Sequence, residues 1–271
     1  MDLLNVEAVV QPRALEDVPQ WQPGWAWLAG GTWLFSEPQP HLTTLVDMGH
    51  LGWSELSVTS EGIEIGATCA MAKLLGLEIP AEWPAIAALN QAVHELASFK
   101  VQGTATIVGN ICLALPASTF APVMVLLGAR YQILSSSGES RWLDAADFQT
   151  GACQTQLEPG EVMRRILIPT DFLTWEVCYR RLCLASAGIA VAIAVAARNP
   201  AREQMRYAIG GGLPAPVLLE LGAEEVSFGA VLDDVIPRDR WLDNVTGGAD
   251  YRRAMTAVLM GQCFDALSQT P

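Results

Sequence analysis

The 271-residue sequence predicts an α+β fold in two domains, and three observations support this prediction. Short strand patterns alternate with helical patterns in the first part of the chain. After Pro169, three strand patterns follow one another without an intervening helix. The chain then ends in one long helical pattern. Strands and helices gathered in separate blocks are typical of α+β proteins. We therefore predict a first domain over residues 1–172 and a second over 173–271.

Short apolar runs bounded by Gly or Pro predict the strands of the first domain. These runs cover residues 26–29, 42–47, 63–67, 131–134 and 162–168. Apolar residues three and four positions apart predict an amphipathic helix over 82–98; they are Trp83, Ile86, Leu89, Val93 and Leu96. A second helix is predicted over 118–127, with Ser118 as its N-cap.

The second domain is predicted to hold strands over 176–182, 188–197 and 204–209. The apolar run over 182–197 is 16 residues long, shorter than the ~20 residues of a membrane-spanning helix. We therefore expect buried strands there and no membrane span. The final helix is predicted to bury one stripe of side chains, namely Tyr251, Met255, Val258, Leu259, Gln262 and Ala266.

Composition excludes several classes of protein. Hydrophobic residues make up 51% of the chain and charged residues 17%, which excludes a disordered chain. The net charge of −13 excludes binding to nucleic acid through phosphates. Asp2 and Glu7 stand where a secretory signal carries Lys or Arg, so we expect a cytoplasmic protein. The six cysteines form no CxxC or Cys/His cluster, so no metal site is expected.

Two glycine-containing turns are the candidate binding motifs. The first comprises Trp27, Leu28, Ala29, Gly30, Gly31, Thr32, Trp33 and Leu34, and the second includes Thr106, Val108, Gly109 and Asn110. Glycine lets the backbone approach a ligand closely, and successive N–H groups can then surround an anion. Two such loops, one on each side, would suit the diphosphate of a dinucleotide. The alternative is that both are ordinary glycines at strand ends.

Several sequence blocks resemble, in order, the FAD-binding subunits of the molybdenum hydroxylases. These blocks are AGGTWLF, LVDM, IEIGAT, TATIVGNIC, PASTFAPVMVLLGA, DFQTG and LEPGEVMRRILIP. That family includes the medium subunits of carbon monoxide dehydrogenases and the flavin domains of xanthine dehydrogenases. The resemblance implies an FAD-binding domain of the vanillyl-alcohol oxidase type, followed by a small α+β C-terminal domain. It also implies non-covalent FAD with its diphosphate between residues 29–34 and 106–110.

The resemblance implies further contacts with the cofactor. It places Leu96 near the flavin, and Met163 and Arg180 close to the isoalloxazine ring. A cation there would stabilise the negative charge of the reduced flavin; the alternative is that Arg180 is solvated. Three positions depart from the family pattern: Trp33 replaces an Asp, Val108 replaces a Gly, and Thr119 stands where an acidic residue is expected.

The resemblance predicts an oxidoreductase subunit that transfers electrons through FAD. Electrons would come from molybdopterin on a large partner subunit through [2Fe-2S] clusters on a small one. They would pass to NAD, oxygen or another acceptor, and the complex would be a dimer of heterotrimers. No side chain of this chain is expected to be catalytic, because the redox chemistry belongs to the flavin. Two alternatives are a structural subunit with a decayed flavin site, indicated by Val108 and Thr119, and a stand-alone flavin oxidase.

Overall fold

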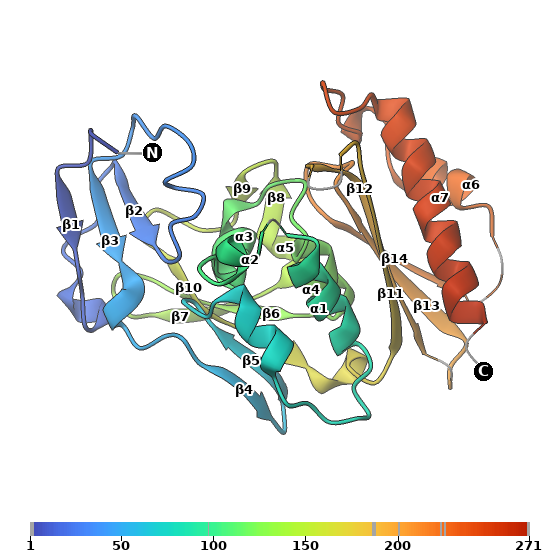
Figure 1. Cartoon of the computed structure of the whole chain (residues 1–271), viewed down its shortest axis with the longest axis horizontal. Helices are drawn as coiled ribbons and strands as arrows, with labels where there is room; N and C mark the ends of the chain where they lie inside the picture. The colour runs from blue at the N-terminus through green and yellow to red at the C-terminus, as the bar shows by residue number, and fades with distance from the viewer. Residues whose placement is uncertain are drawn as a thin grey trace.

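The computed structural model describes residues 3–96, 98–185, 188–199, 201–222, 224 and 226–269. Figure 1 shows three parts in a row: a small N-terminal sheet, a central sheet with its helices, and a C-terminal sheet covered by the last helices. The mixture of helices and mainly antiparallel sheets confirms the predicted α+β class. Among the described residues, no helix is both long and apolar enough to span a membrane.

The N-terminal sheet is parallel and has the strand order β1-β3-β2. It comprises β1 (Ala8–Val10), β2 (Trp25–Leu28) and β3 (Thr44–Asp47). β3 is the middle strand, and Leu45 and Val46 on it are buried. Because β2 ends at Leu28, the first glycine turn leaves the sheet directly at its edge.

The central sheet is antiparallel with the order β4-β5-β10-β6-β7. Its strands are β4 (Leu56–Thr59), β5 (Gly62–Gly66), β6 (Arg130–Leu134), β7 (Ser140–Asp144) and β10 (Val162–Pro169). On β10, Ile166 is fully buried, whereas Arg165 is half-buried and forms an ion pair with Glu64 at 2.9 Å. One face of this sheet therefore belongs to the core. A small hairpin of β8 (Gln149–Gly151) and β9 (Gln154–Thr155) follows α5.

Short helices connect these strands, and they differ from the predicted helices in extent. They are α1 (Ile86–His94), α2 (Phe99–Gln102), α3 (Ile107–Leu113), α4 (Ala121–Leu126) and α5 (Ala145–Phe148). α1 starts after Pro84 because a proline disfavours the helical conformation in the residue before it. Ser118 lies outside α4, yet its hydroxyl accepts a hydrogen bond from the Ala121 amide at 3.1 Å. The second glycine turn is itself the start of a helix, α3, which was not predicted.

The C-terminal sheet is an antiparallel meander of β11 (Glu176–Cys183), β12 (Ala190–Asn199), β13 (Gln204–Gly210) and β14 (Val217–Gly222). β12 is buried on both faces, which explains the long apolar run. Ile193 and Val195 pack into the central core, while Ala194 and Ala196 pack toward α6 and α7. Small alanines on that face let the last helix approach the sheet closely. β12 thus lies between the two halves of the molecule (Figure 1).

Two helices, α6 (Phe228–Val235) and α7 (Ala249–Ser268), cover the outer face of this sheet. The predicted buried stripe of α7 was right at Leu259, was half-buried against the core at Met255 and Ala266, and was wrong at the other three positions. Tyr251 and Val258 are exposed, and the buried side chains are Arg252, Thr256, Leu259, Met260, Cys263 and Leu267. The helix is rotated because Arg252, a charged residue, is buried at its N-terminal end and hydrogen-bonds to backbone carbonyls there.

Candidate cofactor-binding site

One cavity of about 520 Å³ brings the two glycine turns together. Residues from both predicted domains line it, including the start of β12. All the predicted site residues line this cavity except Leu28 and Arg180. Those that do are Trp27, Ala29, Gly30, Gly31, Thr32, Trp33, Leu34, Leu96, Thr106, Val108, Gly109, Asn110, Thr119 and Met163. Residues far apart in the sequence thus converge on one space of a size typical of small-molecule sites.

The first loop, residues 29–34, depends on both of its glycines. A Cβ atom on Gly30 would lie 2.1 Å from the backbone oxygen of Thr104, just before the second loop. Gly31 has a φ of +67°, a conformation that L side chains rarely adopt. Leu28 packs beneath the loop, because its Cδ1 lies 3.0 Å from where a Gly31 Cβ would stand. Leu28 therefore supports the loop from outside the cavity.

The second loop, residues 106–110, is held by the N-cap of α3. The hydroxyl of Thr106 accepts a hydrogen bond from the Gly109 amide at 3.0 Å, and a Cβ on Gly109 would lie 2.7 Å from that oxygen. Val108 lies in the first turn of α3 without a positive φ, so replacing the family's glycine creates no backbone strain here. Ser118 donates a hydrogen bond to Asn110 Oδ1 at 2.6 Å and fixes that side chain.

The cation of the cavity is Arg181, not Arg180. Neighbouring residues of a strand point to opposite faces, and Arg180 is exposed on β11. The Arg181 side chain is 8% exposed and forms an ion pair with Glu95 at 2.9 Å. It also donates a hydrogen bond to the Gly188 carbonyl. Cys178 and Tyr179 are both buried, in different core clusters on the two faces of β11, and the alternation of the strand puts Arg181 on the same face as Tyr179.

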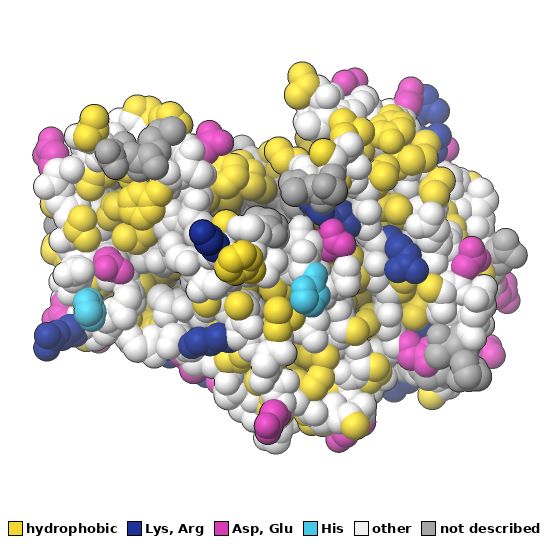
Figure 2. All heavy atoms as spheres, viewed as in Figure 1, with side chains coloured by type: hydrophobic (Ala, Val, Ile, Leu, Met, Phe, Trp, Pro, Cys, Tyr) yellow, Lys and Arg dark blue, Asp and Glu magenta, His cyan; other side chains and the backbone are white. Residues whose placement is uncertain are grey.

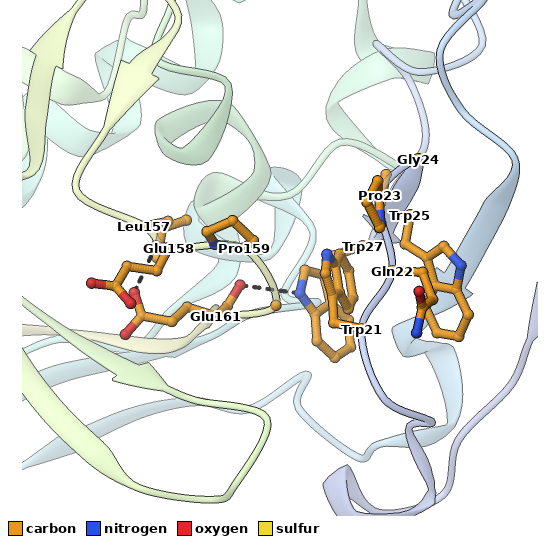
Figure 3. A pocket seen from close by; sticks show the side chains of 12 residues that line it. Trp21, Gln22, Pro23, Gly24, Trp25, Trp27, Leu157, Glu158, Pro159 and Glu161 are labelled. Carbon is orange, nitrogen blue, oxygen red and sulfur yellow. Dashed lines mark hydrogen bonds between the residues drawn. The ribbon is translucent and has the colours of Figure 1, made fainter.

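Glu161 and Trp27 also line the cavity. The carboxylate of Glu161 accepts two hydrogen bonds from Arg141, at 2.9 and 2.7 Å, and these bonds lower the pKa of Glu161. Its backbone carbonyl accepts a hydrogen bond from the Trp27 indole at 3.1 Å. Figure 3 shows this contact, with Trp21 beside Trp27 at a ring-centroid distance of 5.1 Å. A second hollow of about 590 Å³ lies there, and it shares Trp27, Leu157 and Glu161 with the cavity.

Two buried polar atoms of the cavity residues have no hydrogen-bond partner among the described residues. They are the hydroxyl oxygen of Thr119, which is 2% exposed, and Nε of Arg181. An unpaired buried polar group costs about 1–3 kcal/mol, so a bound molecule with acceptor atoms would remove that cost. Arg181 is the sole Lys or Arg among the described lining residues. The cavity therefore suits a ligand whose polar groups are bound mainly by backbone amides and hydroxyl groups, with Arg181 as the cation among the described lining residues.

Several lining residues were not predicted from the sequence. The most important are Glu95, Glu161, Arg181 and the residues 188–190 at the start of β12. Glu95 directly precedes the predicted Leu96, and Arg181 directly follows the predicted Arg180. The 188–190 segment carries no sequence motif, because it reaches the cavity only through the packing of the C-terminal sheet on the central part.

The fold as a whole is similar to that of chains in solved carbon monoxide dehydrogenases. The carbon monoxide dehydrogenase from Hydrogenophaga pseudoflava matches with a TM-score of 0.86, covering 99% of both chains at 21% identity. A family model described as "FAD binding domain in molybdopterin dehydrogenase" matches residues 6–171. The chain therefore belongs to the family of FAD-binding domains of molybdopterin dehydrogenases, as the resemblance predicted.

Curated relatives agree with this membership. Xanthine dehydrogenase 2 of Arabidopsis thaliana is 30% identical over 121 residues, which are 42% of this chain but 9% of that protein. The chain thus aligns with about a tenth of the length of the plant xanthine dehydrogenases that it matches. The glyceraldehyde dehydrogenase medium chain of Sulfolobus acidocaldarius is 27% identical and covers 81% of each chain. The latter is a chain of comparable extent.

Proposed function

We propose that this chain binds one FAD non-covalently, with the diphosphate between residues 29–34 and 106–110. The observation that carries the proposal is that both loops line the same cavity. Neither loop holds a Lys or Arg, so the phosphate oxygens would accept hydrogen bonds from backbone amides and from the Thr32 hydroxyl. The hydroxyl of Thr119 would gain the partner that it lacks among the described residues.

Apolar side chains would surround the rings of the cofactor. Leu96 and Met163 line the cavity and would contact the flavin, as the resemblance predicts. Non-covalent binding agrees with the chemistry of Cys112, the cysteine among the lining residues. Burial raises the pKa of Cys112 to about 12, so its thiol stays protonated and is a poor nucleophile toward a flavin.

We propose that the chain is the FAD-bearing subunit of a molybdopterin-dependent oxidoreductase. FAD, when bound, can receive electrons and pass them to an acceptor such as NAD or oxygen; this chain binds and orients it. The name "medium chain" of two relatives supports an assembly with other subunits. We propose a molybdopterin-binding large subunit, a small subunit with [2Fe-2S] clusters, and a dimer of such heterotrimers.

Exposed apolar side chains support an assembled state. Val9, Trp33 and Phe35 of the N-terminal part are between 40% and 55% exposed. Figure 2 shows hydrophobic side chains gathered on the same part of the molecule. Large exposed apolar areas are uncommon on soluble monomers and mark surfaces that partners cover.

The cofactor proposal is tested by the flavin content of the purified full chain. We expect one FAD per chain, released intact by acid precipitation and identified by its spectrum and mass. Thr32→Val should weaken FAD binding about tenfold, because a hydrogen bond to a charged group contributes ~1.5–3 kcal/mol. Thr104→Val is the matched control, since Thr104 is exposed outside the cavity. A colourless chain that takes up no added FAD would instead support the decayed-site alternative.

The assembly proposal is tested by co-expression with candidate molybdopterin-binding and iron–sulfur subunits from the same organism. The three chains should co-purify in equal amounts, and the flavin in the complex should be reduced when the complex oxidises its substrate. If the chain alone is a monomer that oxidises a substrate without partners, it is a stand-alone oxidase and this proposal is wrong.

A further inference from the structure

The cavity holds one ion pair that joins the two predicted domains. Glu95 directly follows α1 of the first domain, and Arg181 lies on β11 of the second. Arg181 Nη1 is 2.9 Å from Glu95 Oε2, and its Nη2 donates a hydrogen bond to the Gly188 carbonyl. The other carboxylate oxygen of Glu95 accepts a hydrogen bond from Gln91 at 2.9 Å. Both side chains are therefore held in place from several sides.

The Arg181 guanidinium is fixed in orientation on the cavity wall. Each of its terminal nitrogens donates one hydrogen bond, to Glu95 and to the Gly188 carbonyl, whereas the buried Nε has no partner among the described residues. An Arg side chain has five N–H donors in a fixed plane, so these two bonds fix the position of the whole charged group. Arg181 thus brings a fixed positive charge to the residues that line the cavity.

The Glu95–Arg181 pair controls the charge at this end of the cavity. The other lining carboxylate, Glu161, is already paired with Arg141 through two hydrogen bonds. Arg181 is the sole lining Lys or Arg among the described residues, and its positive charge is partly offset by Glu95. Neutralising Arg181 would therefore make this end of the cavity more negative by one charge. Neutralising Glu95 would make it more positive by one charge.

We propose that Arg181 raises the reduction potential of bound FAD and that Glu95, as its counter-ion, limits this effect. The inference rests on the proposed binding of FAD in the cavity. Reduction adds negative charge to the flavin at its N1 and C2 carbonyl end, and a fixed cation at that end stabilises the reduced form over the oxidised form. Glu95 weakens that field by pairing with the same guanidinium. The potential of the cofactor is thus set jointly by one residue from each domain.

The test is spectroelectrochemical titration of the flavin in the full-length, FAD-loaded chain. Arg181→Met should lower the reduction potential of the bound flavin by at least about 30 mV. For a two-electron couple this corresponds to a tenfold loss of affinity for reduced FAD relative to oxidised FAD. Glu95→Gln should shift the potential upward. Arg181→Lys, which keeps the charge, should restore most of the difference that Arg181→Met creates.

Two control variants make the same kinds of substitution at positions outside the cavity. Arg180→Met removes the neighbouring cation, which is exposed on the other face of β11. Glu64→Gln neutralises a carboxylate that is paired with Arg165 at 2.9 Å on the central sheet. Neither residue lines the cavity. Both controls should keep the potential of the unmodified chain.

The outcomes separate this inference from the proposed function. If no variant and no unmodified chain binds FAD, the proposed function itself fails. If FAD binds but Arg181→Met weakens the oxidised and reduced forms equally, Arg181 contacts the diphosphate and the inference is wrong. It is also wrong if Glu95→Gln lowers the potential, or if Arg180→Met shifts it as much as Arg181→Met does.

Discussion

A Cβ atom placed on Gly30 would lie 2.1 Å from the carbonyl oxygen of Thr104, so the first loop touches the backbone that leads into the second. Glycine is required at this position because of contact between two loops, in addition to any contact with a ligand. Because the two loops are in contact, we expect a side chain added at Gly30 to displace the backbone at Thr104.

Gly30→Ala is expected to destabilise the chain by about 1–3 kcal/mol, the usual cost of inserting a methyl group into a packed site. The displaced loops should also lower the FAD content. Thermal unfolding and flavin absorbance measure the two effects. Gly229→Ala is the control, because Gly229 in α6 has open space around its Cβ position and alanine favours helices. If the Gly30→Ala variant had the same stability and flavin content as the original chain, the contact between the two loops would be contradicted.

Thr119→Val is expected to weaken FAD binding without destabilising the FAD-free chain. The FAD-free variant should be at least as stable as the original chain, because the buried hydroxyl has no partner among the described residues. FAD should bind about tenfold more weakly, a loss of ~1.4 kcal/mol, because the hydroxyl no longer donates to the cofactor. Urea unfolding and FAD titration give the two values.

Thr256→Val provides the comparison for Thr119→Val. The Thr256 hydroxyl is buried and donates a hydrogen bond to the Arg252 carbonyl at 2.8 Å. Its loss should lower the stability by about 1 kcal/mol and leave FAD affinity unchanged. FAD binding to Thr119→Val with the original affinity would show that this hydroxyl does not contact the cofactor.

Arg252→Met is expected to lower the free energy of unfolding by at least about 3 kcal/mol, because several buried oxygens lose their donor at once. The Arg252 side chain donates to the carbonyls of Val191, Gly211 and Gly247, and to the side chains of Asn244 and Thr246. Val191 directly follows the residues of β12 that line the cavity. Urea unfolding measures the loss.

Arg253→Met is the matched control on the same helix. Arg253 forms a partly exposed ion pair with Asp233 at 3.1 Å, and such pairs contribute at most about 1 kcal/mol. Equal losses of stability in Arg252→Met and Arg253→Met would mean that the buried hydrogen bonds of Arg252 do not hold the C-terminal part together.

Sequence patterns predicted best the strands that are mostly apolar and end at a proline or a glycine. The strand predicted over 162–168 is β10 (Val162–Pro169), and the one over 204–209 is β13 (Gln204–Gly210). Prolines and glycines marked their ends, because these residues act through local backbone conformation. The two glycine loops could be found for the same reason, and the family resemblance gave about half of the residues that line the cavity.

Tertiary packing decided which face of each element is turned inward. The predicted α7 stripe missed Arg252 because backbone carbonyls of other segments make its burial favourable, and no hydropathy pattern contains that information. Likewise, the sequence placed two arginines side by side on β11, but the packing of β11 against α1 selected Arg181 as the cavity residue and gave it Glu95 as a partner.

The sequence by itself thus determined the α+β class, the family and the two loops that approach each other. Local conformational preferences and short motifs are sufficient for these. The tertiary structure alone decided which charges face the cavity. A side chain's direction and its counter-ion depend on residues such as Glu95 and Arg181 that are distant in sequence and meet only when the C-terminal sheet packs onto the central helices.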